Sequence, residues 1–280
     1  MKKDPYIERG SEILRELRET KVPRGILAVW YLGQESILVK GQGDTVISID
    51  PYLSTSSSRR FQPPFRPSDL TDLSYVCITH DHLDHLDPDT IAPIASVNEN
   101  TTYIAPGFCY QQLLDCGVNA EQIIVADTNQ VWEDEHIKVK AIPAAHETFE
   151  HDPTNGHRFV GYIIEINGVK LYHAGDTLVY PELVTVLKDE QSDLAFLPIN
   201  GRDYFRYSRN IMGNMDVREA AELAVEAGIE TVIPVHYDMF AGNLEWPGRF
   251  IDYMYEHYPH QKTHVLARFE RYFYISRDAF

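Results

Sequence analysis

The sequence predicts an α/β fold in which strands and helices lie in layers. Two short signals carry this prediction. Asn167-Gly168 separates two strand-like runs and is typical of a β-hairpin, because both turn positions favour positive φ. Residues 216–227 begin with a capping box made by Asp216 and Glu219 and stop at Gly228, which predicts a helix. With 280 residues, 44% of them hydrophobic, the chain can bury a large core as one unit.

The remaining elements follow from apolar runs bounded by turn residues. The predicted strands are residues 26–32, 36–40, 45–49, 75–78, 102–105, 137–142, 161–166, 169–173, 194–198, 231–235, 264–267 and 272–275. The predicted helices are residues 5–20, 106–116, 181–189, 216–227 and 246–258. Residues 53–67, rich in Ser, Arg and Pro, are expected to form a long ordered loop.

No linker, repeat or low-complexity tract divides the chain. We therefore expect one domain over residues 1–280, with residues 1–22 as an N-terminal helical extension. No signal-peptide-like apolar run follows Met1, and no segment approaches the roughly 20 apolar residues of a membrane span. Three cysteines are too few for a disulfide framework. These features predict a cytoplasmic protein without a membrane partner, and they leave a homo-oligomer open.

The most informative segment is residues 79–85, Thr-His-Asp-His-Leu-Asp-His, which follows the apolar run 75–78. Imidazole and carboxylate groups are favoured ligands of divalent cations, and crowding them at a strand end would be electrostatically unfavourable without a cation. Residues two apart in extended backbone project to one side, so His80 and His82 can bind the same ion. Asp84 and His85 need a turn, which would carry them toward a second ion, roughly 3.5 to 4 Å away in two-metal hydrolases.

Three later segments end strand-like runs on further ligand types. His146 follows residues 137–142, Asp176 follows the second hairpin strand and Gly175, and His236 follows residues 231–235. The order of the four pieces resembles the metallo-β-lactamase superfamily over residues 28–236. The stretches 172–177, 200–202, 212–216 and 232–238 resemble its L-ascorbate-6-phosphate lactonase-like branch.

This resemblance implies a four-layer αβ/βα sandwich with metals at one edge, between two sheets. It also implies two divalent metal ions. The first is held by His80, His82 and His146, and the second by Asp84, His85 and His236, with Asp176 bridging both. An isolated histidine is by default a structural one, but the ordered series favours ligation here.

The identity of the metal stays open between manganese and zinc, with iron as a third choice. Imidazoles and carboxylates without cysteine suit all three, and affinity order favours zinc over manganese. The lactonase resemblance favours manganese. Redox relatives in the superfamily carry a glutamate in place of the second histidine of the motif, so His82 argues against di-iron chemistry.

The metals imply a hydrolase that uses a hydroxide shared by the two ions. Asp84 would hold the second ion, orient the hydroxide and later act as a proton carrier. His173 and Tyr237 are looser candidates for protonating the leaving group. His173, Tyr237 and Asp238 are also candidates for fixing the orientation of a ligand, a role that we prefer for His173 and Asp238.

The net charge of −17 bears on the substrate. Nucleic-acid binding depends on Lys and Arg, so this acidic balance disfavours a nucleic-acid partner. Residues 202–209 nevertheless interleave arginine with aromatic residues, and guanidinium groups suit anions. Arg202 is the first candidate for contacting a small anionic metabolite, because Gly201 allows a sharp turn after the strand 194–198. The secondary candidates are Asn200, Arg206 and Arg209.

Three functions are consistent with these patterns. The leading one is a lactonase-like or esterase-like hydrolase acting on a small anionic metabolite, such as a phosphorylated sugar-like compound. The second is a phosphodiesterase or ribonuclease of the same superfamily, which the acidic balance disfavours. The third is a non-catalytic metal-binding scaffold, which the complete ligand set disfavours.

Overall fold

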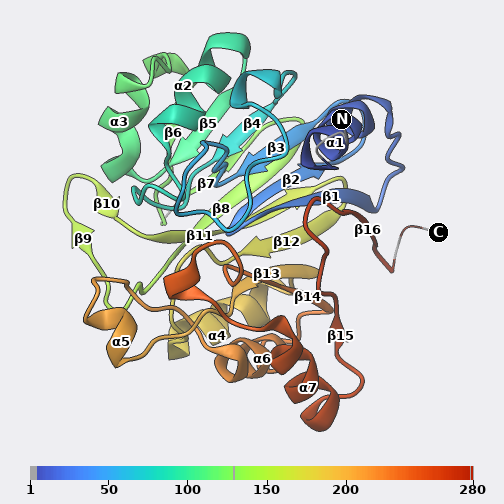
Figure 1. Ribbon diagram of the computed structural model, residues 1–280, viewed down its shortest axis with the longest axis vertical. Coiled ribbons are helices and arrows are strands. Elements are labelled where there is room, and N and C mark those ends of the chain that lie inside the picture. The colour runs from blue at the N-terminus through green and yellow to red at the C-terminus, as the bar shows by residue number, and fades with distance from the viewer. Residues whose placement is uncertain (1–4, 129, 278, 280) are drawn as a thin grey trace.

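The computed structural model describes residues 5–128, 130–277 and 279, and two seven-stranded mixed sheets pack face to face within them (Figure 1). The first sheet has the order β16-β1-β2-β3-β4-β5-β6. Its strands are β1 (Ile26–Gly33), β2 (Ser36–Lys40), β3 (Val46–Ile49), β4 (Tyr75–Cys77), β5 (Thr102–Ala105), β6 (Ile123–Val125) and β16 (Arg271–Ile275).

The second sheet has the order β15-β14-β13-β12-β11-β8-β7. Its strands are β7 (Val131–Glu133), β8 (Ile137–Pro143), β11 (Val160–Ile166), β12 (Val169–His173), β13 (Leu194–Pro198), β14 (Thr231–Val235) and β15 (Lys262–Thr263). The hairpin β9 (His151–Asp152) and β10 (Gly156–His157) stands apart from both sheets (Figure 1). The predicted Asn167-Gly168 turn joins β11 to β12, with positive φ at both residues.

Helices cover the outer face of each sheet. The first sheet is covered by α1 (Pro5–Glu19), α2 (Pro88–Val97) and α3 (Tyr110–Asp115), and the second by α4 (Pro181–Glu190), α6 (Val217–Glu226) and α7 (Pro247–His257) (Figure 1). A short helix, α5 (Tyr204–Tyr207), lies beyond β13. The resulting order of helix, sheet, sheet and helix confirms the predicted four-layer αβ/βα sandwich.

The burial pattern explains why the strands have continuous apolar runs. In β1, Leu27 and Val29 belong to the core between the sheets, while Ala28 and Trp30 belong to the core beneath α1, α2 and α3. Alternate residues of a strand point to opposite faces, so a sheet covered on both faces needs apolar residues at every position. Trp30 also donates from Nε1 to Glu16 Oε2 at 2.8 Å, which ties α1 to this sheet.

Several element predictions need correction. The predicted strand 264–267 is wrong: β15 ends at Thr263, and this segment has no strand structure, although His264 N donates to Val232 O. The helix α2 was missed because Pro93 lies inside it, although Asp87 caps its first turn by accepting from Asp89 N. The strands β6 and β7 are too short to give a clear periodic signal. None of the helices in the described residues is long and apolar enough to cross a membrane.

Candidate metal centre

The candidate site lies at the carboxyl ends of four strands drawn from both sheets. His80 follows β4, His146 follows β8, Asp176 follows β12 and His236 follows β14. In open α/β sheets, ligands bind outside the carboxyl ends of parallel strands, because the chain leaves the sheet there and side chains can converge. The turn predicted after His82 is present, since His85 N donates to His82 O at 3.0 Å.

The structure brings all seven predicted ligands together. They form two groups, and within each group the ligand atoms lie within 4.8 Å of one another: His80, His82, His146 and Asp176 in one, Asp84, His85 and His236 in the other. Asp176 faces both groups. Its Oδ2 lies 3.4 Å from His146 Nε2, while its Oδ1 lies 3.3 Å from His236 Nε2 and 3.6 Å from His85 Nε2. Asp176 therefore has one carboxylate oxygen beside each group.

Orphaned polar atoms show that the cluster fits a cation. His80 Nε2, His85 Nε2 and Asp176 Oδ1 are buried without a hydrogen-bond partner, whereas buried polar groups in proteins are nearly always paired. The other ring nitrogens are held in place. His85 Nδ1 donates to Asp50 Oδ2 at 2.8 Å, and His146 Nδ1 donates to Gly213 O at 3.1 Å. A histidine held in this way presents Nε2 as a lone-pair donor, as metal ligands do.

The protonation of the metal-free cluster reflects burial and close opposite charges. Burial lowers the pKa of His80 well below its usual value, which keeps its imidazole neutral and able to bind a metal. Burial also disfavours a charged His85, but the carboxylates of Asp176 and Asp50 outweigh it and raise the pKa of His85 to about 10. Burial raises the pKa of Asp176, yet His236 and His85 hold it well below its usual range. Without metal, protons on imidazoles therefore compensate the carboxylates.

Two supporting residues, Asp50 and Gln34, were not found from the sequence. Asp50 follows β3 directly and accepts from Thr79 N (2.8 Å) and Thr79 Oγ1 (2.6 Å) as well as from His85. Gln34, in the β1–β2 turn, donates from Nε2 to Asp84 Oδ2 at 2.7 Å. A carboxylate directly after a buried strand was a usable signal for Asp50. Gln34 gave none, because its role depends on how the turn approaches the opposite sheet.

The residues predicted to orient the ligands have other partners. His173 donates from Nε2 to Glu35 O at 2.9 Å, Tyr237 stacks on Tyr31, and Asp238 accepts from Arg268 Nε at 2.7 Å. Among the described residues, the hydrogen bonds of these three do not reach the side chain of a predicted ligand. Hydrogen bonds to the side chains of the predicted ligands come instead from four other residues, Asp50, Thr79, Gln34 and Gly213.

The predicted substrate residues are largely engaged with one another. Asn200 is buried and bonds to the side chains of Asn214 and Asn243. Arg202 is held by Glu219 through two contacts of 2.6 Å, so in this structure it is not free to bind an anion.

Arg206 likewise bonds to Asp203, Asn243 and Leu244 O. Arg209 is exposed, and its main-chain N donates to Arg206 O at 3.0 Å, but among the described residues its guanidinium makes neither a hydrogen bond nor an ion pair. Any contact of Arg202 with substrate stays a prediction that requires Glu219 to release it.

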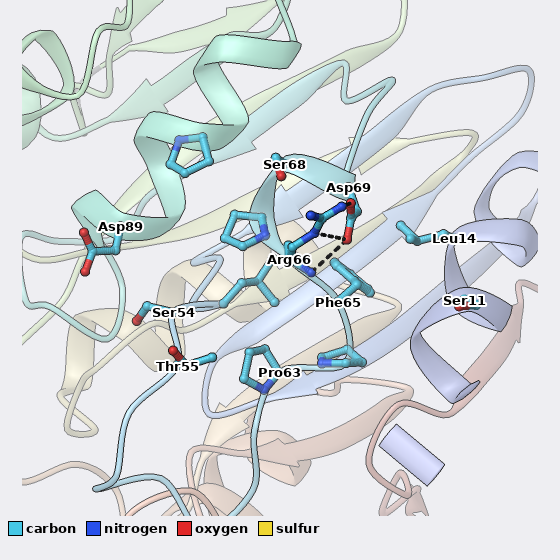
Figure 2. A pocket seen from close by; sticks show the side chains of 14 residues that line it. Ser11, Leu14, Ser54, Thr55, Pro63, Phe65, Arg66, Ser68, Asp69 and Asp89 are labelled. Carbon is cyan, nitrogen blue, oxygen red and sulfur yellow. Dashed lines mark hydrogen bonds and ion pairs between the residues drawn. The ribbon is translucent and has the colours of Figure 1, made fainter. Parts of the chain in front are cut away.

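The cluster opens to solvent at the motif itself. His82 and Asp84 are half-buried and Leu83 between them is 63% exposed, while the other five ligands are buried. A separate surface cavity of about 660 Å³ lies between α1, the loop after Leu53 and α2 (Figure 2). None of the seven predicted ligands lines it, and its guanidinium, that of Arg66, is turned onto Asp69. We therefore place the chemistry at the strand ends.

The fold and the cluster define a class of protein: an αβ/βα sandwich with candidate metal-binding groups at its strand ends. The model of the beta-lactamase superfamily domain matches residues 45–237, and the chain belongs to this family. A UPF0173 metal-dependent hydrolase from Caldivirga maquilingensis is 27% identical, covering 84% of this chain and 93% of its own. A probable L-ascorbate-6-phosphate lactonase, UlaG, from Salmonella heidelberg is 24% identical, covering 84% of this chain and 76% of its own.

Solved structures agree on the fold. Igni18, a metallo hydrolase from Ignicoccus hospitalis, superposes with a TM-score of 0.68 at 23% identity and covers 89% of this chain and 98% of its own. At this identity the likeness shows the architecture alone. Taken together, the family match and the relatives make this chain a metal-dependent hydrolase of the metallo-β-lactamase superfamily.

Proposed function

We propose that this chain hydrolyses a lactone or ester bond in a small anionic metabolite, with two divalent ions held by His80, His82, Asp84, His85, His146, Asp176 and His236. The observation that carries the proposal is the convergence of buried, unpartnered ligand atoms around Asp176, whose two oxygens face two separate ligand groups. The metal is manganese or zinc, with iron as a third choice, because the donor set contains only imidazoles and carboxylates.

The residues divide the work by position. Bound divalent ions supply Lewis acidity, which lowers the pKa of water and polarises the group under attack. Asp84 is half-buried and open to solvent, so its carboxylate can accept a hydrogen bond from the attacking water and hold it in line. Gln34 fixes Asp84 Oδ2 through its Nε2 donor, leaving the other oxygen, Oδ1, for that role. Burial of the remaining ligands excludes bulk water from their side of the cluster.

The substrate class rests on the relatives and on one arginine. The probable L-ascorbate-6-phosphate lactonase relative supports a lactone. Arg209 supports an anionic group, because it lies in the loop whose Gly213 contacts His146 and its guanidinium has no protein partner among the described residues. Phosphodiester hydrolysis is retained only as an outcome of the test.

Elemental analysis and a substrate panel test this proposal. Purified protein should hold close to two equivalents of transition metal, and Asp176→Ala should lose most of it, because that carboxylate faces both ligand groups. The metal-loaded enzyme is then assayed against lactones, simple esters, anionic esters and phosphodiesters. Turnover of phosphodiesters alone, or full metal retention in Asp176→Ala, would contradict the proposal.

A further inference from the structure

A buried glutamate near the candidate centre has a carboxylate without a hydrogen bond. Glu35 occupies the turn between β1 and β2, next to Gln34, and its side chain is 0% exposed. Neither of its carboxylate oxygens has a hydrogen-bond partner. An unpaired carboxyl group in a protein interior is costly, so its presence needs a physical reason.

Contacts through His173 and Gly175 connect Glu35 to the segment that carries Asp176. Glu35 Oε2 lies 3.3 Å from His173 Nε2, which donates its hydrogen to the main-chain oxygen of Glu35. The other ring nitrogen, His173 Nδ1, accepts from Gly175 N at 3.3 Å, and Asp176 is the next residue. Among the described residues, no lysine or arginine pairs with Glu35.

The charges around Glu35 are negative. In the metal-free protein, burial, together with the nearby carboxylates of Asp176, Asp50 and Asp84, raises the pKa of Glu35 well above its usual value, whereas nearby divalent cations would favour its ionised form. Four carboxylates are thus gathered in or beside one cluster, three of them buried and Asp84 half-buried. Such a group is unfavourable in a cation-free interior. Two divalent ions would carry four positive charges, equal to the charge of the four carboxylates when ionised.

We propose that Glu35 is an outer anion of the metal centre, which strengthens the binding of the divalent ions by its negative charge without contacting them. This inference rests on the proposed function, because it assumes that the seven residues around Asp176 bind the ions. Glu35 is placed for this role by the β1–β2 turn, which also positions Gln34 against Asp84. Its partner His173 is in turn hydrogen-bonded to the segment that carries Asp176.

The test is the affinity for metal alone, measured by competition between the purified protein and a chromophoric chelator for Zn²⁺ and Mn²⁺. Glu35→Gln should lower the affinity by about ten- to a hundredfold, the usual cost of losing an outer partner of a metal site. The same variant should melt at an equal or higher temperature than the metal-free wild type, because a buried carboxyl with no hydrogen bond is removed. If the glutamate were merely structural, Glu35→Gln would keep its metal affinity and melt at a lower temperature.

A matched control is Glu230→Gln. The side chain of Glu230 is 8% exposed and pairs with Lys262, and it precedes β14, whereas His236 follows the same strand at its other end. This variant should melt at a lower temperature and keep its metal affinity. Glu35→Asp is the second test variant and remains informative if Glu35→Gln does not fold. Because it keeps the charge, its metal affinity should stay within about threefold of wild type.

The outcomes of these measurements separate the hypotheses. Unchanged metal affinity in Glu35→Gln overturns the inference, as does a tenfold loss in Glu35→Asp at an unchanged melting temperature. Wild-type metal binding in Asp176→Ala overturns the proposed site itself, and the inference with it. Loss of metal in Asp176→Ala together with normal affinity in Glu35→Gln leaves the site standing and removes only the role of Glu35.

Discussion

The motif at residues 80–85 and the loop at residues 202–209 are equally dense in chemically active side chains, yet the structure uses them differently. The motif side chains converge with His146, Asp176 and His236, which follow β8, β12 and β14. The loop arginines mostly pair nearby, Arg206 with Asp203 and Arg202 with Glu219. A run of chemically active residues therefore forms a site only where the fold leaves their side chains without protein partners.

The difference has a physical cause. The side chains of His80 and His85 are held through Nδ1, which bonds to Thr79 Oγ1 in both residues, so their Nε2 atoms remain available. Long, flexible arginines on a surface loop can reach a carboxylate of the same loop or of a neighbouring helix, and they form partly exposed ion pairs that contribute little free energy each. The Nε2 atoms of His80 and His85 have no hydrogen-bond partner, whereas the guanidinium of Arg202 makes two contacts with Glu219.

The largest expected effect is on Asp84. Asp84→Asn keeps the shape and the hydrogen bond from Gln34 but removes the charge that orients water. We expect turnover to fall about 10²-fold or more, which is the usual scale of general acid-base catalysis. Steady-state kinetics and circular dichroism of the same preparation measure activity and fold. Near-normal turnover in a folded, metal-loaded variant would remove Asp84 from the mechanism.

The next effect tests the partners that hold the ligands. Asp50→Asn should weaken metal binding by about ten- to a hundredfold, because the acceptor of His85 Nδ1 loses its charge. Chelator competition measures this affinity. The control is Asp69→Asn, since Asp69 pairs with the exposed Arg66 far from any ligand in the sequence. Equal affinities in the two variants would show that Asp50 only supports the loop.

A smaller effect separates the two loop arginines. Arg209→Ala should raise the Michaelis constant for an anionic ester by up to about fivefold, because an exposed charge contact contributes at most about 1 kcal/mol. Arg202→Ala should change that constant by less than about twofold, since Glu219 already occupies its guanidinium. A neutral ester is the reference substrate. A larger effect from Arg202 than from Arg209 would show that substrate displaces Glu219, and would restore the loop as a binding site.

The smallest effect is on acid stability. Hydrogen bonding to Arg202 lowers the pKa of Glu219. A carboxyl with a lower pKa in the folded state stabilises the protein above its unfolded pKa of about 4.3, and this stabilisation is lost as the pH falls through the folded value. At pH 7 the free energy of unfolding of the wild type should thus be about 0.2–1 kcal/mol larger than that of Arg202→Ala, a range set by the partial exposure of the ion pair. Urea unfolding from pH 7 to pH 3 should show this difference vanishing. A constant difference would locate the effect in packing.

The sequence by itself determined the layered fold and the seven clustered side chains, because both depend on local signals. Periodic apolar runs locate most strands, and ligand types that end strands meet wherever those strands share an edge. It did not locate α2, in which Pro93 disguises the helix, nor the end of β15 at Thr263. The tertiary structure alone decided the surroundings. The β1–β2 turn brings Gln34 and Glu35 to the cluster, and the end of β3 brings Asp50. Arg202 is bound by Glu219, which lies on a separate helix, α6. Such contacts depend on how separate elements pack, and no spacing along the chain records them.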